Sequence, residues 1–165
     1  MHATKLTNKA KGSTHNLTFN HAMAQIIVNI VPGDGLAAAD ITSNVSAVKI
    51  KSTVPTATLT ITAGDINATN KAAVEAADIS ILGSGASNVG LIVPQSVAGG
   101  SDFIAVTYNG NTHTYSLPAG TPKVFAEGTS YTYTFTLTAA GIQLKSLEIT
   151  NWADGGTVAP DAIII

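Results

Sequence analysis

The sequence predicts an all-β protein in which short strands pair antiparallel to form a sandwich or a barrel. Twenty-two of the 165 residues are threonine, and charged residues make up only 11% of the chain, where about 25% is usual. Threonine is β-branched, favours strands and can also face water, so it covers a solvated face without charges. Short alternating runs are separated by Gly, Asn, Asp and Pro, without the strand–helix rhythm of a parallel sheet.

The first strand pattern lies between residues 17 and 30 and changes phase near its middle. Apolar residues alternate from Leu17 to Met23, and the alternation continues from Ala24 to Ile30 with the opposite phase. A one-residue slip in a period-two pattern moves every side chain to the other face of the sheet. We therefore expect a β-bulge near Ala24 or Gln25 that absorbs the extra residue.

Nine further segments complete a prediction of eight to ten strands. The clearest is 131–138, where aromatic and aliphatic residues alternate with threonines and give one dry and one hydroxyl-lined face. Asn109-Gly110-Asn111 between alternating runs is the strongest short-range signal for a β-hairpin. Residues 70–78 are the helical candidate, because Asn70 can cap an alanine-rich run. The other expected strands are 45–51, 58–62, 78–82, 90–93, 103–108, 112–117, 142–149 and 162–165.

The composition excludes several classes of function. The chain has no cysteine, which excludes disulfide scaffolds, thiolate metal sites, iron–sulfur proteins and cysteine hydrolases. Its eight basic residues are all lysine and its net charge is −2, so it lacks the basic footprint that nucleic acid requires. Glycines and a proline interrupt the longest uncharged stretch, 79–101, and we expect no membrane-spanning segment.

No catalytic, metal or cofactor site is expected, and we predict that the protein is not an enzyme. The glycine-rich run 83–88 lacks the third glycine and the helix of a nucleotide-binding loop, which favours an ordinary inter-strand loop. His21 and His113 lie on apolar faces, where a core histidine bonded to backbone carbonyls is favoured over a ligand or catalytic role. The run 65–69 lacks the bidentate glutamate of a calcium loop, and the three glutamates form no catalytic pair.

One domain is predicted, covering residues 17–165, because no linker or internal repeat divides the chain. Residues 1–16 read as a polar lead or a cloning remnant. A chain of this length buries roughly 70% of the surface that it exposes when unfolded. It can therefore hold a core without disulfides or metals.

Five short motifs lie in a fixed order between residues 17 and 156, nearly the whole chain. In this order they resemble the motifs of the fimbrillin family, the subunits and subunit-like lipoproteins of type V pili in Gram-negative anaerobes. The motifs are the strand 17–30 with Phe19-Asn20-His21, the segment Leu91-Ile92-Val93-Pro94-Gln95, the strand and turn at 103–110, the strand 127–135 that begins Glu127-Gly128-Thr129-Ser130-Tyr131, and the closing segment 149–155 with Ile149-Thr150-Asn151-Trp152.

The resemblance implies a transthyretin-like β-sandwich of the Greek-key type on the outer-membrane surface or in a fimbria. It implies a structural, adhesive protein whose partners are other fimbrial subunits, or host surface proteins and glycans, in a homo-oligomer or polymer. Such subunits are exported, lipid-anchored through an N-terminal cysteine and trimmed by a trypsin-like protease. Loss of an N-terminal strand then leaves a groove, and a strand of the next subunit fills it.

The chain departs from the family pattern in two residue types. It has no cysteine that could carry the lipid, so we expect the anchor to lie upstream of this chain or to be absent. It also has no arginine for the usual cleavage. The candidate positions for proteolytic processing are therefore Lys9 and Lys11.

The C-terminal residues are the candidate segment for strand exchange. Ala162, Ile163, Ile164 and Ile165 form an apolar terminus that promotes aggregation unless it is covered. One interpretation is that this segment docks into a neighbouring subunit. The other is that it closes its own sandwich as the last strand, as termini commonly do.

A second hypothesis for the function is a carbohydrate-binding β-sandwich module of a bacterial surface protein. A glycan platform needs an aromatic ring whose face is open to water, and Trp152 is the main candidate. A buried Trp152 would favour a role in the core instead.

Overall fold

The computed structural model describes residues 2–3, 11–12, 14, 19–62, 65–70 and 77–152. This part of the chain forms fifteen strands and one short helix. In chain order the elements are β1 (His2–Ala3), β2 (Phe19–Asn20), β3 (Ala24–Pro32), α1 (Ala38–Asn44), β4 (Val45–Thr53), β5 (Ala57–Thr62), β6 (Asp65–Asn70), β7 (Ala77–Ser80), β8 (Leu82–Ser84), β9 (Ser87–Ile92), β10 (Gln95–Val97), β11 (Asp102–Tyr108), β12 (Asn111–Ser116), β13 (Lys123–Phe125), β14 (Thr129–Thr138) and β15 (Gly141–Asn151).

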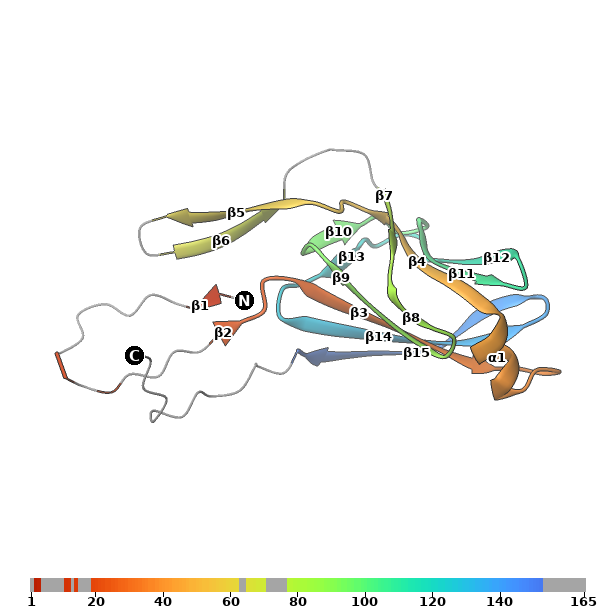
Figure 1. The fold of residues 1–165 in the computed structure, drawn as a ribbon. Coiled ribbons are helices and arrows are strands. Elements are labelled where there is room, and N and C mark those ends of the chain that lie inside the picture. The colour runs from red at the N-terminus through yellow and green to blue at the C-terminus, as the bar shows by residue number, and fades with distance from the viewer. Residues whose placement is uncertain are drawn as a thin grey trace.

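Two sheets face each other and enclose the core, as Figure 1 shows. One sheet has the strand order β12-β11-β4-β7, and the other has the order β15-β14-β3-β9-β8. The smaller sheets β1-β2, β5-β6 and β10-β13 have two strands each. The all-β sandwich predicted from the sequence is confirmed, and the transthyretin-like Greek-key connectivity stays a prediction.

The pairing of β3 with β14 differs from the antiparallel arrangement that the sequence predicts. These two strands run parallel, with Gln25 opposite Ser130 and Pro32 opposite Leu137, whereas the other described pairs are antiparallel. A parallel pair needs a long connection, and almost the whole sandwich lies between β3 and β14 in sequence. Alternation of side chains is the same for either direction, so the sequence pattern could not distinguish the two.

Alternate residues of β3 and β14 form the central part of the core. Tyr131, Tyr133, Phe135 and Leu137 are buried, while the threonines between them are half-buried on the other face. The predicted dry and hydroxyl-lined faces of 131–138 are thus confirmed. Across the sandwich, Phe103 of β11 packs on Tyr133, with ring centroids 5.5 Å apart.

The phase change in the first strand is accommodated by a break instead of the expected bulge. β2 ends at Asn20 and β3 begins at Ala24, and β3 then pairs without a register shift on both sides. Residues 21–23 connect the two strands and take no part in the strand pairing on either side. A bulge near Ala24 or Gln25 is therefore wrong, because the chain changes direction between two separate strands.

The helix of the described part lies in a segment where the sequence predicts none. Of the candidate 70–78, residues 71–76 lie outside the described residues, and its two ends belong to β6 and β7. The observed helix α1 buries Ile41 against the sandwich. The carboxylate of Asp40 accepts a hydrogen bond from the Ala37 N–H, 2.7 Å away, which satisfies one free donor of the first turn. The capping carboxylate belongs to Asp40, which lies within the helix, whereas the N-cap residue itself is Ala37. The sequence therefore shows no capping residue before the helix.

The predicted hairpin is confirmed with a two-residue turn. Tyr108 pairs with Asn111, so the loop consists of Asn109 and Gly110. Their φ angles of 48° and 78° fit a type I′ turn, which favours Asn-Gly.

The chain crosses between the two sheets at Ile81. β7 belongs to the four-stranded sheet and β8 to the five-stranded sheet, and the Ile81 N–H donates to the carbonyl oxygen of Val48 across 3.1 Å. Ile81 packs so closely on Gly90 of β9 that a Cβ at Gly90 would clash with its side chain. Glycine at position 90 therefore makes room for the crossing.

Gln95 and Tyr131, each a residue of a recognised motif, form side-chain hydrogen bonds to the backbone of a neighbouring segment. The Gln95 side chain accepts a hydrogen bond from the Val54 N–H (2.8 Å) and donates to the Val54 carbonyl oxygen (3.2 Å), tying β10 to the end of β4. The Tyr131 hydroxyl accepts from the Ala126 N–H (2.8 Å) and donates to the Val124 carbonyl oxygen (3.2 Å). Both motifs thus fix a loop against the sandwich.

Gly90→Ala is expected to destabilise the protein by about 1–3 kcal/mol, because the added methyl group overpacks the contact with Ile81. Chemical denaturation measures the change. The control is Thr114→Ala on an exposed position of β12, which should change stability by less than about 0.5 kcal/mol. Equal denaturation midpoints for Gly90→Ala and the wild type would contradict the close packing of Ile81 on Gly90.

Tyr133→Phe is expected to leave stability at pH 7 unchanged or higher, because the buried Tyr133 hydroxyl has no hydrogen-bond partner within the described part. The matched variant Tyr131→Phe loses two hydrogen bonds and should cost about 1–3 kcal/mol.

Burial raises the pKa of Tyr133 above its ordinary 10.0. Below pH 10 the phenol is neutral in both the folded and the unfolded state, so it adds no pH dependence there. Above pH 10 the unfolded chain ionises while the buried Tyr133 stays neutral, so the wild type loses stability as the pH rises. Denaturation at pH values below and above 10 should show that the free energy of unfolding falls less with rising pH for Tyr133→Phe than for the wild type.

Candidate functional site

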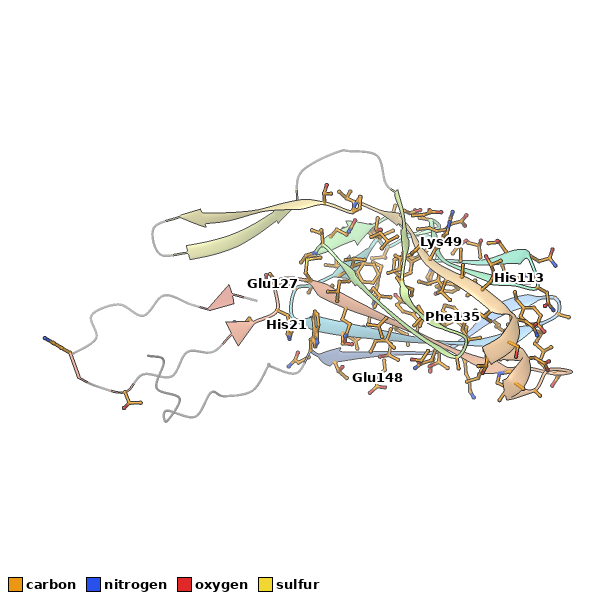
Figure 2. All side chains as sticks on the ribbon, in the orientation of Figure 1. His21, Lys49, His113, Glu127, Phe135 and Glu148 are labelled. Carbon is orange, nitrogen blue, oxygen red and sulfur yellow. The ribbon has the colours of Figure 1, made fainter. Side chains whose placement is uncertain are left out.

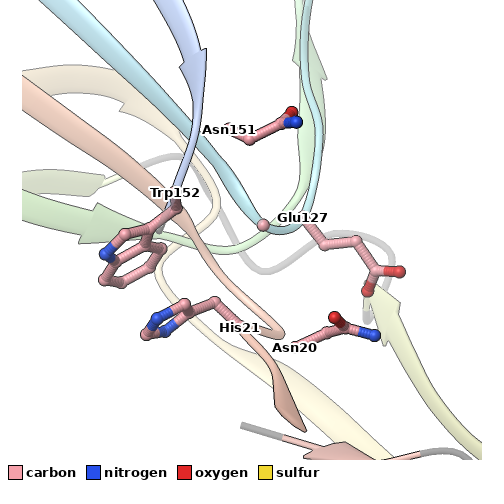
Figure 3. A pocket seen from close by; sticks show the side chains of 6 residues that line it. Asn20, His21, Glu127, Asn151 and Trp152 are labelled. Atoms are coloured by element: carbon pink, nitrogen blue, oxygen red, sulfur yellow. The ribbon is translucent and has the colours of Figure 1, made fainter. Parts of the chain in front are cut away.

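Segments from the beginning and from the end of the sandwich sequence meet at one end of the molecule, called the pole, where they form a polar pocket. The pocket has a volume of about 330 Å³ and is lined by Asn20, His21, Glu127, Gly128, Asn151 and Trp152. Figure 3 shows these side chains around it. They come from the end of β2, the turn before β14 and the end of β15. Three segments that are far apart in sequence therefore build one site.

Backbone hydrogen bonds through Gly128 hold the three segments together. The Trp152 N–H donates to the Gly128 carbonyl oxygen across 2.7 Å, and the Gly128 N–H donates to the Met23 carbonyl oxygen across 3.1 Å. Gly128 has a φ angle of 62°, in the left-handed region that favours glycine. The turn before β14 thus links the connection that precedes β3 to the residue that follows β15.

His21 and Trp152 stack on each other at the wall of the polar pocket. Their ring centroids lie 3.7 Å apart and their planes differ by 6°. Both side chains are half-buried. The prediction that His21 is a core histidine bonded to backbone carbonyls is therefore wrong, because the break after β2 places its ring against the indole at the surface.

His113 lies at the other end of the sandwich, as Figure 2 shows. It is half-buried on β12 opposite Val106, so it lies on the inner face that the sequence predicts, at the sheet margin. The two histidines are therefore not part of one site. The described residues contain no group of three or more His, Cys, Asp or Glu side chains placed to hold a metal ion.

An apolar groove adjoins the polar pocket and shares Trp152 with it. Its volume is about 490 Å³, and it is lined by Gln25, Ile79, Ser80, Ile81, Val89, Gly90, Leu91 and Trp152. Val89 and Leu91 are 38% and 46% exposed, which is unusual for large aliphatic side chains on a strand. The groove therefore presents apolar surface to solvent where the chain crosses between the sheets.

The edge of β9 is open along this groove. β8 pairs with β9 only as far as Val89, and from Gly90 to Ile92 β9 pairs with β3 alone among the described strands. Unpaired backbone groups at such an edge are a template for another strand. The open edge and the apolar groove share Gly90 and Leu91.

The remaining predicted positions fall outside this pole or outside the described residues. Lys11 is exposed in a turn with Gly12, while Lys9 lies outside the described residues. The run 83–88, expected as an inter-strand loop, is mostly strand: 83–84 end β8 and 87–88 begin β9, so only Gly85 and Ala86 form the turn. The buried Asn88 side chain donates to the Gly85 carbonyl oxygen across 3.0 Å. Ala162, Ile163, Ile164 and Ile165 also lie outside the described residues.

Sequence reasoning identified Trp152 but missed the other members of the polar pocket. Asn20, Glu127 and Asn151 are exposed residues beside strand ends, and such residues are common in any turn. Their convergence depends on the pairing of β3 with β14. The signal in the sequence was that Asn20, Glu127 and Asn151 lie within three of the recognised motifs.

Residues 1–152 match the model of a family described as fimbrillin-like. The chain belongs to the fimbrillin-like family. The resemblance inferred from the five motifs is thus confirmed. No curated protein matches the chain.

The chain is similar to solved structures from Bacteroides and Porphyromonas species. A proposed cell adhesion protein from Bacteroides uniformis aligns with a TM-score of 0.69 and 23% identity, over 83% of this chain and 53% of that protein. Another from Bacteroides ovatus aligns with a TM-score of 0.56 and 19% identity, over 80% and 46%. The tip fimbrial protein Mfa3 from Porphyromonas gingivalis, truncated at its C-terminus, gives 0.49 and 14%, over 81% and 52%. This fimbrillin-like chain spans about half the length of these structures.

No helix in the described part of this fimbrillin-like chain has the length and apolar character needed to cross a membrane. The helix present, α1, has seven residues.

His21→Ala is expected to shift the fluorescence of Trp152 to longer wavelength and to increase its quenching by acrylamide, because one face of the indole loses its cover. Trp152 is the only tryptophan, so the emission reports on this pole alone. His113→Ala, at the far end, is the control and should leave the spectrum unchanged. An unchanged spectrum for His21→Ala would refute the stacked arrangement.

Proposed function

We propose that this fimbrillin-like chain is a structural and adhesive subunit at the outer-membrane surface of a bacterium, and that it joins neighbouring subunits by strand addition. The family match over residues 1–152 carries the assignment to a fimbria or a related surface adhesin. The apolar groove beside the open edge of β9 supports the mode of assembly. Its partners are other copies or related subunits, and no catalytic role is proposed.

The open edge offers both components of strand recognition. Backbone groups from Gly90 to Ile92 provide hydrogen bonds that any strand can use, and the groove provides pockets for alternate apolar side chains. A strand placed there also covers Val89 and Leu91. Burial of such side chains stabilises a complex by roughly 25 cal/mol per Å² of apolar surface.

The donor in this proposal is Ala162, Ile163, Ile164 and Ile165 of a neighbouring copy. These residues follow Trp152, which lines the groove, by a further thirteen positions at most. An extended chain covers about 3.3–3.6 Å per residue, so the segment could span roughly 40 Å and reach an adjacent molecule. Its apolar side chains match the apolar lining of the groove.

Cleavage after Lys9 or Lys11 is the proposed control of assembly. β1 pairs with β2 through His2 opposite Asn20 and Ala3 opposite Phe19. A cut in the exposed turn at Lys11 would separate β1 from the rest of the chain. The edge of β2, at the same pole as the polar pocket, would then be uncovered.

Deletion of Ile163–Ile165 is expected to abolish self-association, and Leu91→Lys is expected to do the same by placing a charge in the groove. Val124→Lys, an equally apolar and 63% exposed position outside the groove, is the control. Light scattering and sedimentation velocity give the masses.

A mixture of the deletion variant and Leu91→Lys distinguishes strand exchange between molecules from closure of each sandwich by its own terminus. The deletion variant keeps its groove and Leu91→Lys keeps its donor, so a mixture should form heterodimers and nothing larger. If the terminus closes its own sandwich, the wild type and both variants remain monomeric, and the variants show only a lower melting temperature.

A further inference from the structure

We propose that the polar pocket binds a neutral saccharide, such as the terminal sugar of a glycan. The pocket has a volume of about 330 Å³, at the lower end of the range for small-molecule sites. Such a space suits one sugar ring and not an extended chain. The site lies at a pole of the sandwich, so a glycan could reach it end-on. This binding activity goes beyond the assembly role and does not depend on it.

The lining offers the mixture of hydrogen-bonding groups that vicinal hydroxyls require. The carboxamides of Asn20 and Asn151 each provide a donor and an acceptor, and the Glu127 carboxylate accepts through two oxygens. Every sugar hydroxyl is itself both a donor and an acceptor. Adjacent hydroxyls can therefore pair with an amide or with the carboxylate at two points.

The stacked rings of His21 and Trp152 supply the apolar component of such a site. Their parallel contact at 3.7 Å holds both rings in fixed orientation, so little conformational freedom is lost on binding. Figure 3 shows the two rings together, with Asn20 and Glu127 on the other side of the pocket. A sugar ring has C–H patches next to hydroxyls, which match aromatic surface beside polar groups.

The charges of the lining disfavour the other common ligand classes. Among the described residues no lysine lines the pocket, so an anionic group would meet the Glu127 carboxylate without a counterion from them. Of the same described lining, His21 and Glu127 are too few protein ligands for a metal ion, which needs at least three. An apolar ligand would leave the two amides and the carboxylate without partners. A neutral polyol satisfies all of these groups.

The test uses the full chain and a panel of free sugars: galactose, glucose, mannose, fucose, N-acetylglucosamine and N-acetylgalactosamine, with sialic acid as the charged comparison. At least one neutral sugar should cause a saturable change in Trp152 emission. The same sugar should receive saturation transfer from the protein in NMR. Sialic acid should bind more weakly than the best neutral sugar.

Glu127→Gln and Asn151→Ala should each weaken that binding by about tenfold, the effect of one lost hydrogen bond. Glu148→Gln removes an exposed carboxylate of β15 outside the pocket and should bind as the wild type does. The variant residues are exposed, and far-UV circular dichroism checks that they fold. The proposal is overturned if no sugar on the panel gives a saturable signal, or if Glu127→Gln and Asn151→Ala both bind like the wild type.

Discussion

The parallel pairing of β3 with β14 is the constraint on which the rest of the structure depends. It places the first long strand in the middle of the five-stranded sheet, between β9 and β14, where Ala24, Ile26 and Val28 are fully buried. The ladder cannot form until both ends of the sandwich sequence are present, which makes it a slow, non-local contact. It also brings Met23, Gly128 and Trp152 together, so the fold and the polar pocket have the same origin.

Hydroxyl groups, and not charges, cover much of the surface of this sandwich. On β14 the threonines lie between two neighbouring strands and are half-buried, where a charged side chain would lose part of its hydration. Lys51 and Asp78 form an ion pair of 3.3 Å between β4 and β7, and its partly exposed geometry contributes at most about 1 kcal/mol. Stability therefore depends on apolar packing between the sheets, and the low charge content is consistent with this.

The sequence predicts those features that are local in the chain. The alternation in 131–138 and the Asn109-Gly110 turn depend on neighbouring residues, and both are confirmed. The direction of β3 relative to β14, the break at 21–23 and the cap of α1 by Asp40 depend on distant contacts or on a side chain in an unexpected position. The polar pocket falls in the second group, because His21 reads as a core residue until the end of β15 is placed beside it.

Trp152 belongs to both cavities at this pole, since its indole lines the polar pocket and the apolar groove. A single side chain shared by two binding sites makes their equilibria interdependent. If a bound sugar fixes the indole in one position, it changes the affinity of the groove for a strand by some factor, and the strand must change the affinity for the sugar by the same factor. Attachment to a glycan and growth of a polymer would then be thermodynamically linked through one residue, without any movement of the sandwich itself.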